Sequence, residues 1–326
     1  MNVLIFGING FVGKYLAASF LLSNDNVYGC DVAETLAVPD YNIDFGDGRF
    51  VEPSAFSRVK YNKSDITNIE SVKEIVGIIK PDYIINLAAI SSVGQSWKKP
   101  ELTMRINVNG AVNILEAARE IAPLAKLMFI GSSEEYNAKG QEEGINERAP
   151  LNANNPYGIS KVTQENFIRL YKEKYGMEIY TVRPFNHTGV GQNDNFVLPS
   201  FCKQAAEITK SGKDGEIRVG NLSAKRDFSD VRDVVCAYRL ILESGNCNEV
   251  YNVGSSVARG LDEMLEKIVS FCPNEVTITI DKERFRPEDT PVIKCDNSKI
   301  KRELGYKPKH DIYDTLKEMY EYYVKK

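Results

Sequence analysis

The chain opens with a strand, a glycine turn and a helix, and this order constrains its fold more than any other feature. Residues 2–6 form a short apolar run, as expected for a strand that is buried on both faces of a parallel sheet. Gly7, Gly10 and Gly13 follow with GxxGxxG spacing, and a helical pattern continues to about Leu22. Glycines let the backbone approach a pyrophosphate, whose charge then lies at a helix N-terminus. The stretch therefore predicts a dinucleotide site, although glycines also mark ordinary tight turns.

A second strand, expected over residues 27–31, ends in Asp31. It follows the glycines by about 20 residues, the distance at which a carboxylate accepts hydrogen bonds from the adenosine ribose. A free 2′-hydroxyl suits Asp31, whereas a 2′-phosphate would be repelled, and no Arg follows Asp31 directly. The residue therefore favours NAD(H); the alternative is that Asp31 only caps the end of its strand.

Strand and helix patterns alternate through the first half of the chain, which predicts an α/β fold with a doubly wound parallel sheet of the Rossmann type. After about residue 190 this rhythm is lost. We expect a Rossmann domain over residues 1–185 and a smaller C-terminal α/β domain that comprises most of residues 186–326. Within the second range, a segment of about residues 221–255 is expected to return to the Rossmann domain. Further strands are expected at 58–62, 83–87, 126–130 and 178–182, helices at 68–80, 101–121, 156–175 and 312–324, and loops at 33–56 and 91–97.

Composition narrows the class of protein. A net charge of −4 argues against a nucleic-acid binder, and no apolar run reaches the roughly 18 residues that cross a bilayer. The N-terminus lacks a signal-peptide pattern. Six cysteines without CxxC spacing and only two histidines make a zinc site improbable. These features favour a cytoplasmic protein with reduced thiols and without metal, nucleic-acid or membrane partners.

Tyr157 and Lys161 are four residues apart in a helix that Asn155 and Pro156 are expected to begin. At this spacing both side chains lie on one face. A nearby ammonium favours the phenolate and lowers the pKa of a phenol, so the pair is a candidate proton-transfer unit. The alternative is a solvated helix face.

These motifs together resemble the extended short-chain dehydrogenase/reductases, the nucleotide-sugar epimerase/dehydratase family. The resemblance runs over nearly the whole chain. It implies a nicotinamide cofactor and catalysis by Ser132, Tyr157 and Lys161, with Glu134 as a possible further acid. The cofactor-binding residues that it implies are Gly7, Asn9, Gly10, Phe11, Val12, Gly13, Asp31, Asp65, Ile66, Leu87, Ala88, Ala89, Asn107, Tyr157, Lys161 and Pro184.

Within that family, residues 91–97, 183–192, 220–228 and 286–289 are similar to the reductases of GDP-4-dehydro-6-deoxy-D-mannose. This similarity implies that the 4-keto group of a GDP-6-deoxyhexose is reduced, giving a product of the GDP-D-rhamnose type. Basic side chains in the C-terminal loops are candidates to bind the diphosphate, with a solvated surface as the alternative. The implied substrate-binding residues are Ser91, Ser133, Glu134, Asn186, His187, Val197, Lys203, Arg226, Arg286 and Asp289.

Two alternatives stay open. An acid at the position of Glu134 removes the sugar C5 proton in the family's dehydratases. The first alternative is therefore a GDP-mannose 4,6-dehydratase, or another nucleotide-sugar dehydratase or epimerase, although residues 191–193 depart from the pattern of the GDP-mannose dehydratases. A non-catalytic NAD(P)-binding protein is the second, and it would be expected to lack part of the Ser/Tyr/Lys set. The resemblance also implies a homodimer in which helices 101–121 and 156–175 pair with their copies as a four-helix bundle.

Overall fold

The computed structural model describes residues 1–46, 48–138, 143–282 and 290–326. Its main element is a seven-stranded sheet with the order β12-β8-β7-β6-β1-β2-β5, and each neighbouring pair of strands is parallel. The Rossmann-type parallel sheet predicted from the sequence is therefore confirmed. Its strands are β1 (Asn2–Phe6), β2 (Asn26–Asp31), β5 (Lys60–Lys63), β6 (Tyr83–Asn86), β7 (Lys126–Ile130), β8 (Ile179–Pro184) and β12 (Val250–Val253).

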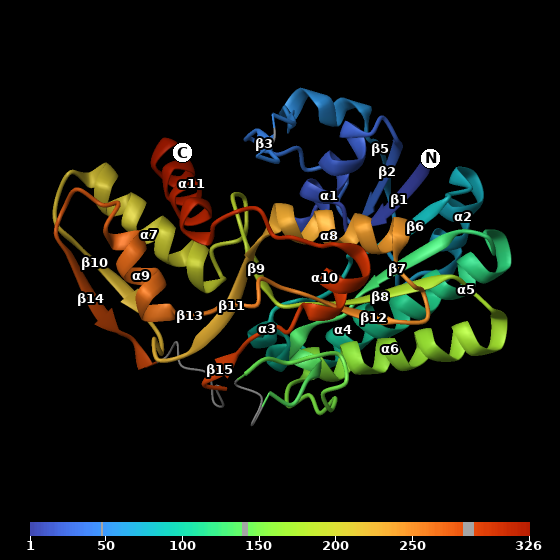
Figure 1. Ribbon diagram of the computed structural model, residues 1–326. Coiled ribbons are helices and arrows are strands. Elements are labelled where there is room, and N and C mark those ends of the chain that lie inside the picture. The colour runs from blue at the N-terminus through green and yellow to red at the C-terminus, as the bar shows by residue number, and fades with distance from the viewer. Residues whose placement is uncertain (47, 139–142, 283–289) are drawn as a thin grey trace.

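Helices cover both faces of this sheet (Figure 1). Side chains alternate along β1, so Val3 and Ile5 pack into the core on the side of α1 and α8, whereas Leu4 and Phe6 pack into the opposite core. A strand that is buried on both faces explains why residues 2–6 are apolar throughout. The covering helices are α1 (Phe11–Leu22) and α8 (Val231–Ser244) on one face and α2 (Ile69–Ile79), α5 (Ala111–Ile121) and α6 (Pro156–Tyr175) on the other.

A smaller lobe, on the left in Figure 1, is built around a separate hydrophobic core. That core joins helices α7 (Val197–Ser211), α9 (Leu261–Val269) and α11 (Ile312–Lys325) to the parallel pair β10 (Gly215–Val219) and β14 (Val276–Ile280). A small sheet lies between the two lobes and comprises β9 (Asn186–Thr188), β11 (Lys225–Asp230), β13 (Ala258–Gly260) and β15 (Val292–Ile293). Helix α10 (Ser298–Leu304) packs on β12.

The order of strands reverses at β1, which has β2 on one side and β6 on the other. In open parallel sheets, ligands bind outside the carboxyl ends of the strands at such a point. Gly7 follows β1 directly and therefore lies at this crevice. The fold thus places the glycine turn where a ligand is expected.

Two segments that were expected to be loops contain regular structure. Residues 33–56 include the hairpin of β3 (Ile43–Asp44) and β4 (Phe50–Val51) and the start of a 3₁₀ helix, η1 (Pro53–Arg58). Residues 91–97 were also predicted wrongly. They contain the helix α3 (Val93–Lys98), which begins because the Ser92 hydroxyl accepts a hydrogen bond from Gln95 N at 3.3 Å.

The helix expected over 101–121 is divided into α4 (Pro100–Met104), a π-helical segment (Arg105–Gly110) and α5. Asn107 explains the irregular segment, because its amide bonds both the N–H and the carbonyl of Ile90 and donates to Ser160 Oγ at 2.9 Å. These bonds tie the helix to the loop after β6, and π segments often mark such functional positions. None of the helices in the described part of the chain is long and apolar enough to span a bilayer.

Candidate active site

A cavity of about 890 Å³ opens at the carboxyl ends of β1, β6, β7 and β8 and extends to the smaller lobe. The glycine turn forms one wall, and the residues after β7 and at the start of α6 form another. The segment from Gln192 to Phe201 and part of β11 line the far end. The cavity therefore joins the expected cofactor region to the expected substrate region.

The glycine turn fits a dinucleotide by its shape. Gly7 has a φ of +80°, and a Cβ there would lie 2.6 Å from Ala88 N. A Cβ on Gly13 would lie 2.5 Å from Ile8 O, so this position also excludes a side chain. Gly10 caps α1 without a side-chain hydrogen bond, which leaves the N–H groups of the first helical turn without a side-chain acceptor. A pyrophosphate is suited to this position because both the N–H groups and the helix dipole favour an anion.

Ser132, Tyr157 and Lys161 line the same cavity. Ser132 follows β7, and its hydroxyl accepts a hydrogen bond from Glu134 N at 3.1 Å. Asn155 begins α6 by accepting from Gly158 N at 2.9 Å, which fixes Tyr157 in the first turn. Gly158 allows α6 to approach closely, because a Cβ there would collide with the carbonyl of Glu134.

Lys161 lies one turn further along α6, with its Nζ 5.9 Å from the centre of the Tyr157 ring. The ammonium donates to Ile130 O at 2.7 Å, and burial lowers the pKa of Lys161 to about 8. Burial raises the pKa of Tyr157 well above its usual value, while a hydrogen bond with Ser132 opposes the rise. The lowered Tyr157 pKa that the sequence led us to expect is therefore wrong for this structure, because burial outweighs the favourable contacts.

Glu134 lies on the cavity wall beside Tyr157. Asn155 Nδ2 donates to Glu134 Oε2 at 2.9 Å, so the residue that caps α6 also holds this carboxylate. An acid so placed can accept a hydrogen bond from a sugar hydroxyl or remove a proton from the sugar ring.

His187 packs against Phe11, with ring centroids 6.4 Å apart and ring planes 9° apart. Its Nδ1 lies 3.0 Å from Phe185 O and donates to that carbonyl, which leaves Nε2 as an acceptor. Burial lowers the pKa of His187, so the imidazole is neutral near pH 7. The arrangement suits a hydrogen bond from a substrate hydroxyl.

Most of the predicted site residues meet at this cavity. The predicted residues on its wall are Gly7, Gly10, Phe11, Val12, Gly13, Leu87, Ala89, Ser91, Ser132, Ser133, Glu134, Tyr157, Lys161, Pro184, Asn186, His187, Val197 and Arg226. Arg286 and Asp289 lie outside the described residues.

The other predicted residues lie behind or beside the wall. Asp31 ends β2 next to the glycine turn, and its carboxylate accepts hydrogen bonds from Asn9 N and Val32 N. Asp65 accepts from Thr67, and Lys203 pairs with Asp194, which is itself on the wall. Ile66 packs against Gly110, Ala88 lies against Gly7 of the glycine turn, and Asn107 accepts a hydrogen bond from Ile90 N.

The far wall was not predicted from the sequence; it comprises the residues from Gln192 to Phe196 and from Leu198 to Phe201. The only signal available was continuity with the preceding segment 183–192. The ion pair between Arg183 and Glu165 was not predicted either. A charged residue within the apolar strand β8 was a usable signal, since a buried guanidinium requires a partner.

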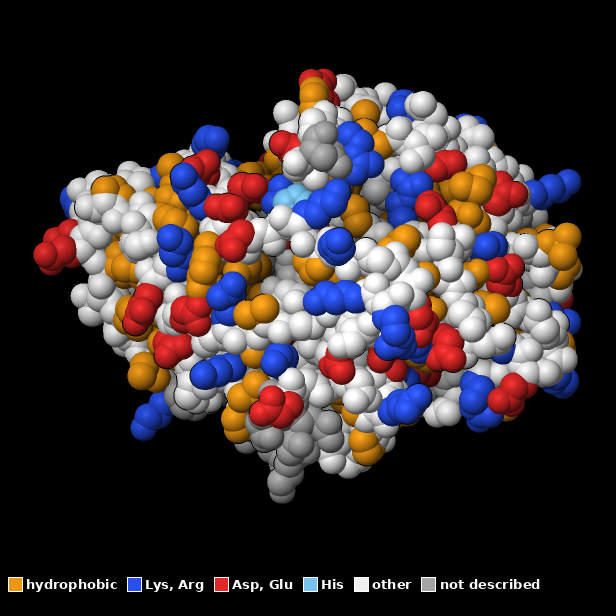
Figure 2. Space-filling model, in the orientation of Figure 1, with side chains coloured by type: hydrophobic (Ala, Val, Ile, Leu, Met, Phe, Trp, Pro, Cys, Tyr) orange, Lys and Arg blue, Asp and Glu red, His pale blue; other side chains and the backbone are white. Residues whose placement is uncertain are grey.

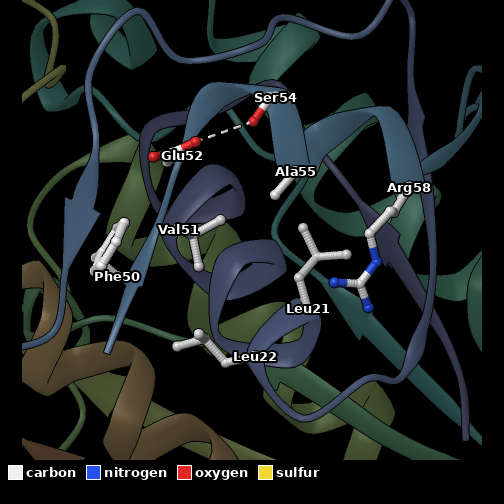
Figure 3. A pocket seen from close by; sticks show the side chains of 8 residues that line it. All are labelled: Leu21, Leu22, Phe50, Val51, Glu52, Ser54, Ala55 and Arg58. Atoms are coloured by element: carbon white, nitrogen blue, oxygen red, sulfur yellow. Dashed lines mark hydrogen bonds between the residues drawn. The ribbon is translucent and has the colours of Figure 1, made fainter. Parts of the chain in front are cut away.

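A second hollow of about 230 Å³ lies between α1, β4 and η1, away from this site (Figure 3). Its walls are mainly apolar, with Glu52 and Arg58 among the lining residues. Glu52 accepts a hydrogen bond from Ser54, and Arg58 donates to Asn24. The charged groups that line it are therefore already engaged with neighbouring side chains.

A Rossmann sheet with a glycine turn at its switch point, and Ser132, Tyr157 and Lys161 beside that turn, defines an extended short-chain dehydrogenase/reductase. Residues 4–319 match the family described as GDP-mannose 4,6 dehydratase. The chain belongs to this family, whose members are NAD(P)-dependent nucleotide-sugar enzymes.

Individual relatives include more than one activity. A GDP-6-deoxy-D-mannose reductase of Pseudomonas aeruginosa is 29% identical over 238 residues, which cover 73% of this chain and 78% of that protein. GDP-mannose 4,6 dehydratase 1 of Arabidopsis thaliana is 29% identical over 326 residues, which cover 97% of this chain and 88% of that protein. The solved structure of RMD from Pseudomonas aeruginosa complexed with NADPH is 24% identical in sequence, with a TM-score of 0.80. The match covers 100% of this chain and 98% of that chain.

Proposed function

We propose that this chain is an NAD(P)H-dependent reductase of the 4-keto group of a GDP-4-keto-6-deoxyhexose. The observation that carries the proposal is the single cavity that holds Ser132, Tyr157 and Lys161 at the glycine turn and Asn186 and Arg226 towards the smaller lobe. A redox cofactor and a sugar nucleotide can meet there.

The reduced nicotinamide, when bound, supplies a hydride to C4 of the sugar. Ser132 donates a hydrogen bond to the 4-keto oxygen and stabilises the charge that develops on it. Tyr157 transfers its phenolic proton to that oxygen. The raised pKa of Tyr157 keeps the phenol protonated across the neutral range, as a proton donor requires. Lys161 binds the nicotinamide ribose and places a positive charge one helical turn from the phenol.

The far end of the cavity supports the choice of substrate. Arg226 and Asn186 lie on neighbouring strands, because β9 pairs with β11, and both line the wall. A guanidinium and an amide there suit a diphosphate. Phe196 and Phe201 add aromatic surface for a base. The assignment of guanine rests on the relatives that act on GDP-sugars.

Glu134 supports a second candidate, a GDP-mannose 4,6-dehydratase, because its carboxylate lies on the wall beside Tyr157. The two candidates differ in their need for reductant. GDP-mannose incubated without added NAD(P)H should remain unchanged if the chain is a reductase. A 4-keto product detected by NMR under those conditions would overturn the reductase and support the dehydratase.

We further propose a homodimer formed by α5 and α6. Ile159 and Leu170 are 47% and 49% exposed on α6, at positions that share one helix face. Exposed apolar side chains on one face of a helix favour a partner helix. Sedimentation at micromolar concentration should give the mass of a dimer, and a monomer throughout would contradict it.

A further inference from the structure

Glu135 is bonded to the main chain of Ser132, and its side chain is completely buried. The Ser132 N–H donates a hydrogen bond to Glu135 Oε1 at 2.6 Å, and the Ser132 hydroxyl accepts one from the backbone of the 3₁₀ turn that follows it. The two residues therefore form a capping box. Oε2 of Glu135 has no hydrogen-bond partner among the described residues. A carboxylate with one donor in so dry a position would be costly if it were charged.

Arg183 does not supply the missing partner. Its Nε and Nη2 bind both oxygens of Glu165, at 2.8 and 2.6 Å, and its Nη1 donates to Tyr136 OH at 2.9 Å. The shortest ion-pair distance between Arg183 and Glu135 Oε2 is 3.9 Å, beyond hydrogen-bonding range. The guanidinium is therefore committed to Glu165 in a two-bond pair.

The two carboxyl groups converge at Gly131. A Cβ on Gly131 would collide with Glu135 Oε1 and lie 3.1 Å from Glu165 Oε1. Burial, and then the charge of Glu165, raise the pKa of Glu135 well above its usual value. If Glu135 and Glu165 were both ionised beside the single Arg183 guanidinium, a net negative charge would be buried. One proton shared between the two carboxyl groups makes the three side chains neutral together.

We propose that Glu135 is a positioning residue: an uncharged carboxylic acid that shares its proton with Glu165 and holds the main chain of Ser132 in place. Its effect on catalysis rests on the function proposed above. Its protonation state is a property of the folded chain and does not depend on that function.

The proton on Glu135 also affects Tyr157 and Lys161. The charged and titratable groups around Glu135 are Glu134 and Tyr136 on its own segment, Tyr157, Lys161 and Glu165 on α6, Arg183 on β8, and Glu147, whose carbonyl accepts from Arg183. An ionised Glu135 raises the pKa of both Tyr157 and Lys161. A neutral Glu135 removes that charge and leaves Tyr157 a stronger proton donor.

Infrared spectroscopy of the full chain in D₂O at pH 7 tests the proton directly. The wild-type protein should show the carbonyl band of a protonated carboxylic acid, and Glu135→Gln should lose it. Glu165→Gln should lose it as well, because Glu135 then ionises beside Arg183. Glu134→Gln, one residue away on the cavity wall, should keep it. A wild-type spectrum without the band, or a band that survives in Glu135→Gln or Glu165→Gln, would overturn the proposal.

Activity measurements test the positioning role. Glu135→Leu removes the acceptor of the buried Ser132 N–H, so kcat should fall about tenfold to a hundredfold while KM changes less than about threefold. Glu135→Gln keeps an acceptor for Ser132 and a donor for Glu165, so it should recover most of that loss. Equal losses in both variants, or a loss in neither, would contradict the role. If no activity of any kind is found, the function fails while the infrared result still decides the state of Glu135.

Discussion

Asn155 donates a 2.9 Å hydrogen bond to Glu134 Oε2 and at the same time accepts from Gly158 N to begin α6. The carboxylate on the cavity wall is thereby fixed relative to the helix that carries Tyr157. The role of Glu134 separates the two candidate reactions, because a base that removes the C5 proton is required only for dehydration.

Replacing Glu134 by Gln therefore distinguishes these reactions. In a reductase the variant loses at most a contact with a sugar hydroxyl, and kcat for reduction should fall about tenfold or less. Steady-state NAD(P)H oxidation measures this. A loss of a hundredfold or more in the conversion of GDP-mannose to a 4-keto product, the effect of removing a general base, would instead support the dehydratase.

Tyr157→Phe removes the proposed proton donor and keeps the ring. Turnover should fall by about 10² to 10⁴. Cofactor affinity, measured by NAD(P)H fluorescence, should change little. Tyr251→Phe is a matched control, since its hydroxyl bonds Asn246 and Glu303 away from the cavity. Near-normal turnover in Tyr157→Phe would exclude the phenol as donor.

The pH dependence of kcat/KM should follow Lys161. Its pKa is lowered to about 8, so the ammonium is present below that pH and is lost as the pH rises through it. Tyr157 stays protonated over the same range because its pKa is raised. We therefore expect kcat/KM to decline above pH about 8, by about tenfold per unit at the limit. A profile that stays flat to pH 10 would contradict this role of Lys161.

Asp31 should set the choice of cofactor. A carboxylate at the end of β2 repels the 2′-phosphate of NADPH, so NADH should give the higher kcat/KM. Asp31→Ser should shift the ratio of the two values towards NADPH by about tenfold or more. Asp82→Ser is the control, because Asp82 accepts a hydrogen bond from Asn2 N at the start of β1. It therefore lies at the amino ends of the strands, whereas Asp31 lies at a carboxyl end. An unchanged ratio in Asp31→Ser would show that Asp31 only caps its strand.

On the face shown in Figure 2, Lys and Arg side chains are interspersed with Asp and Glu and do not form a single basic surface. The net charge of the whole chain is −4. A phosphate backbone requires a basic face, and the face shown in Figure 2 is not one.

Much of the N-terminal half could be predicted because its signals are local. Buried strands such as β1 are apolar throughout, and the glycine turn has a spacing that can be read directly. Tyr157 and Lys161 share one helix face because of their spacing, a rule that holds without tertiary information. The place of Ser132 beside them was implied by the family resemblance.

The remainder depends on contacts between distant residues. The π segment forms around the hydrogen bonds of Asn107 with Ile90 and Ser160, which no local sequence pattern indicates. The pKa of Tyr157 rises because the folded chain buries it, and the spacing to Lys161 carries no information on burial. Glu135 is completely buried beside Glu165, and its position in the sequence, one residue after Glu134, carries no information on that burial.

The most direct test of the proposed function follows a labelled hydride. The chain is supplied with GDP-4-keto-6-deoxymannose and NADH or NADPH that carries deuterium at the transferable C4 position of the nicotinamide. The account predicts one equivalent of cofactor oxidised per product and deuterium at C4 of the sugar, observed by NMR. A chain that leaves this substrate unlabelled, but converts GDP-mannose to a 4-keto product without added reductant, would contradict it.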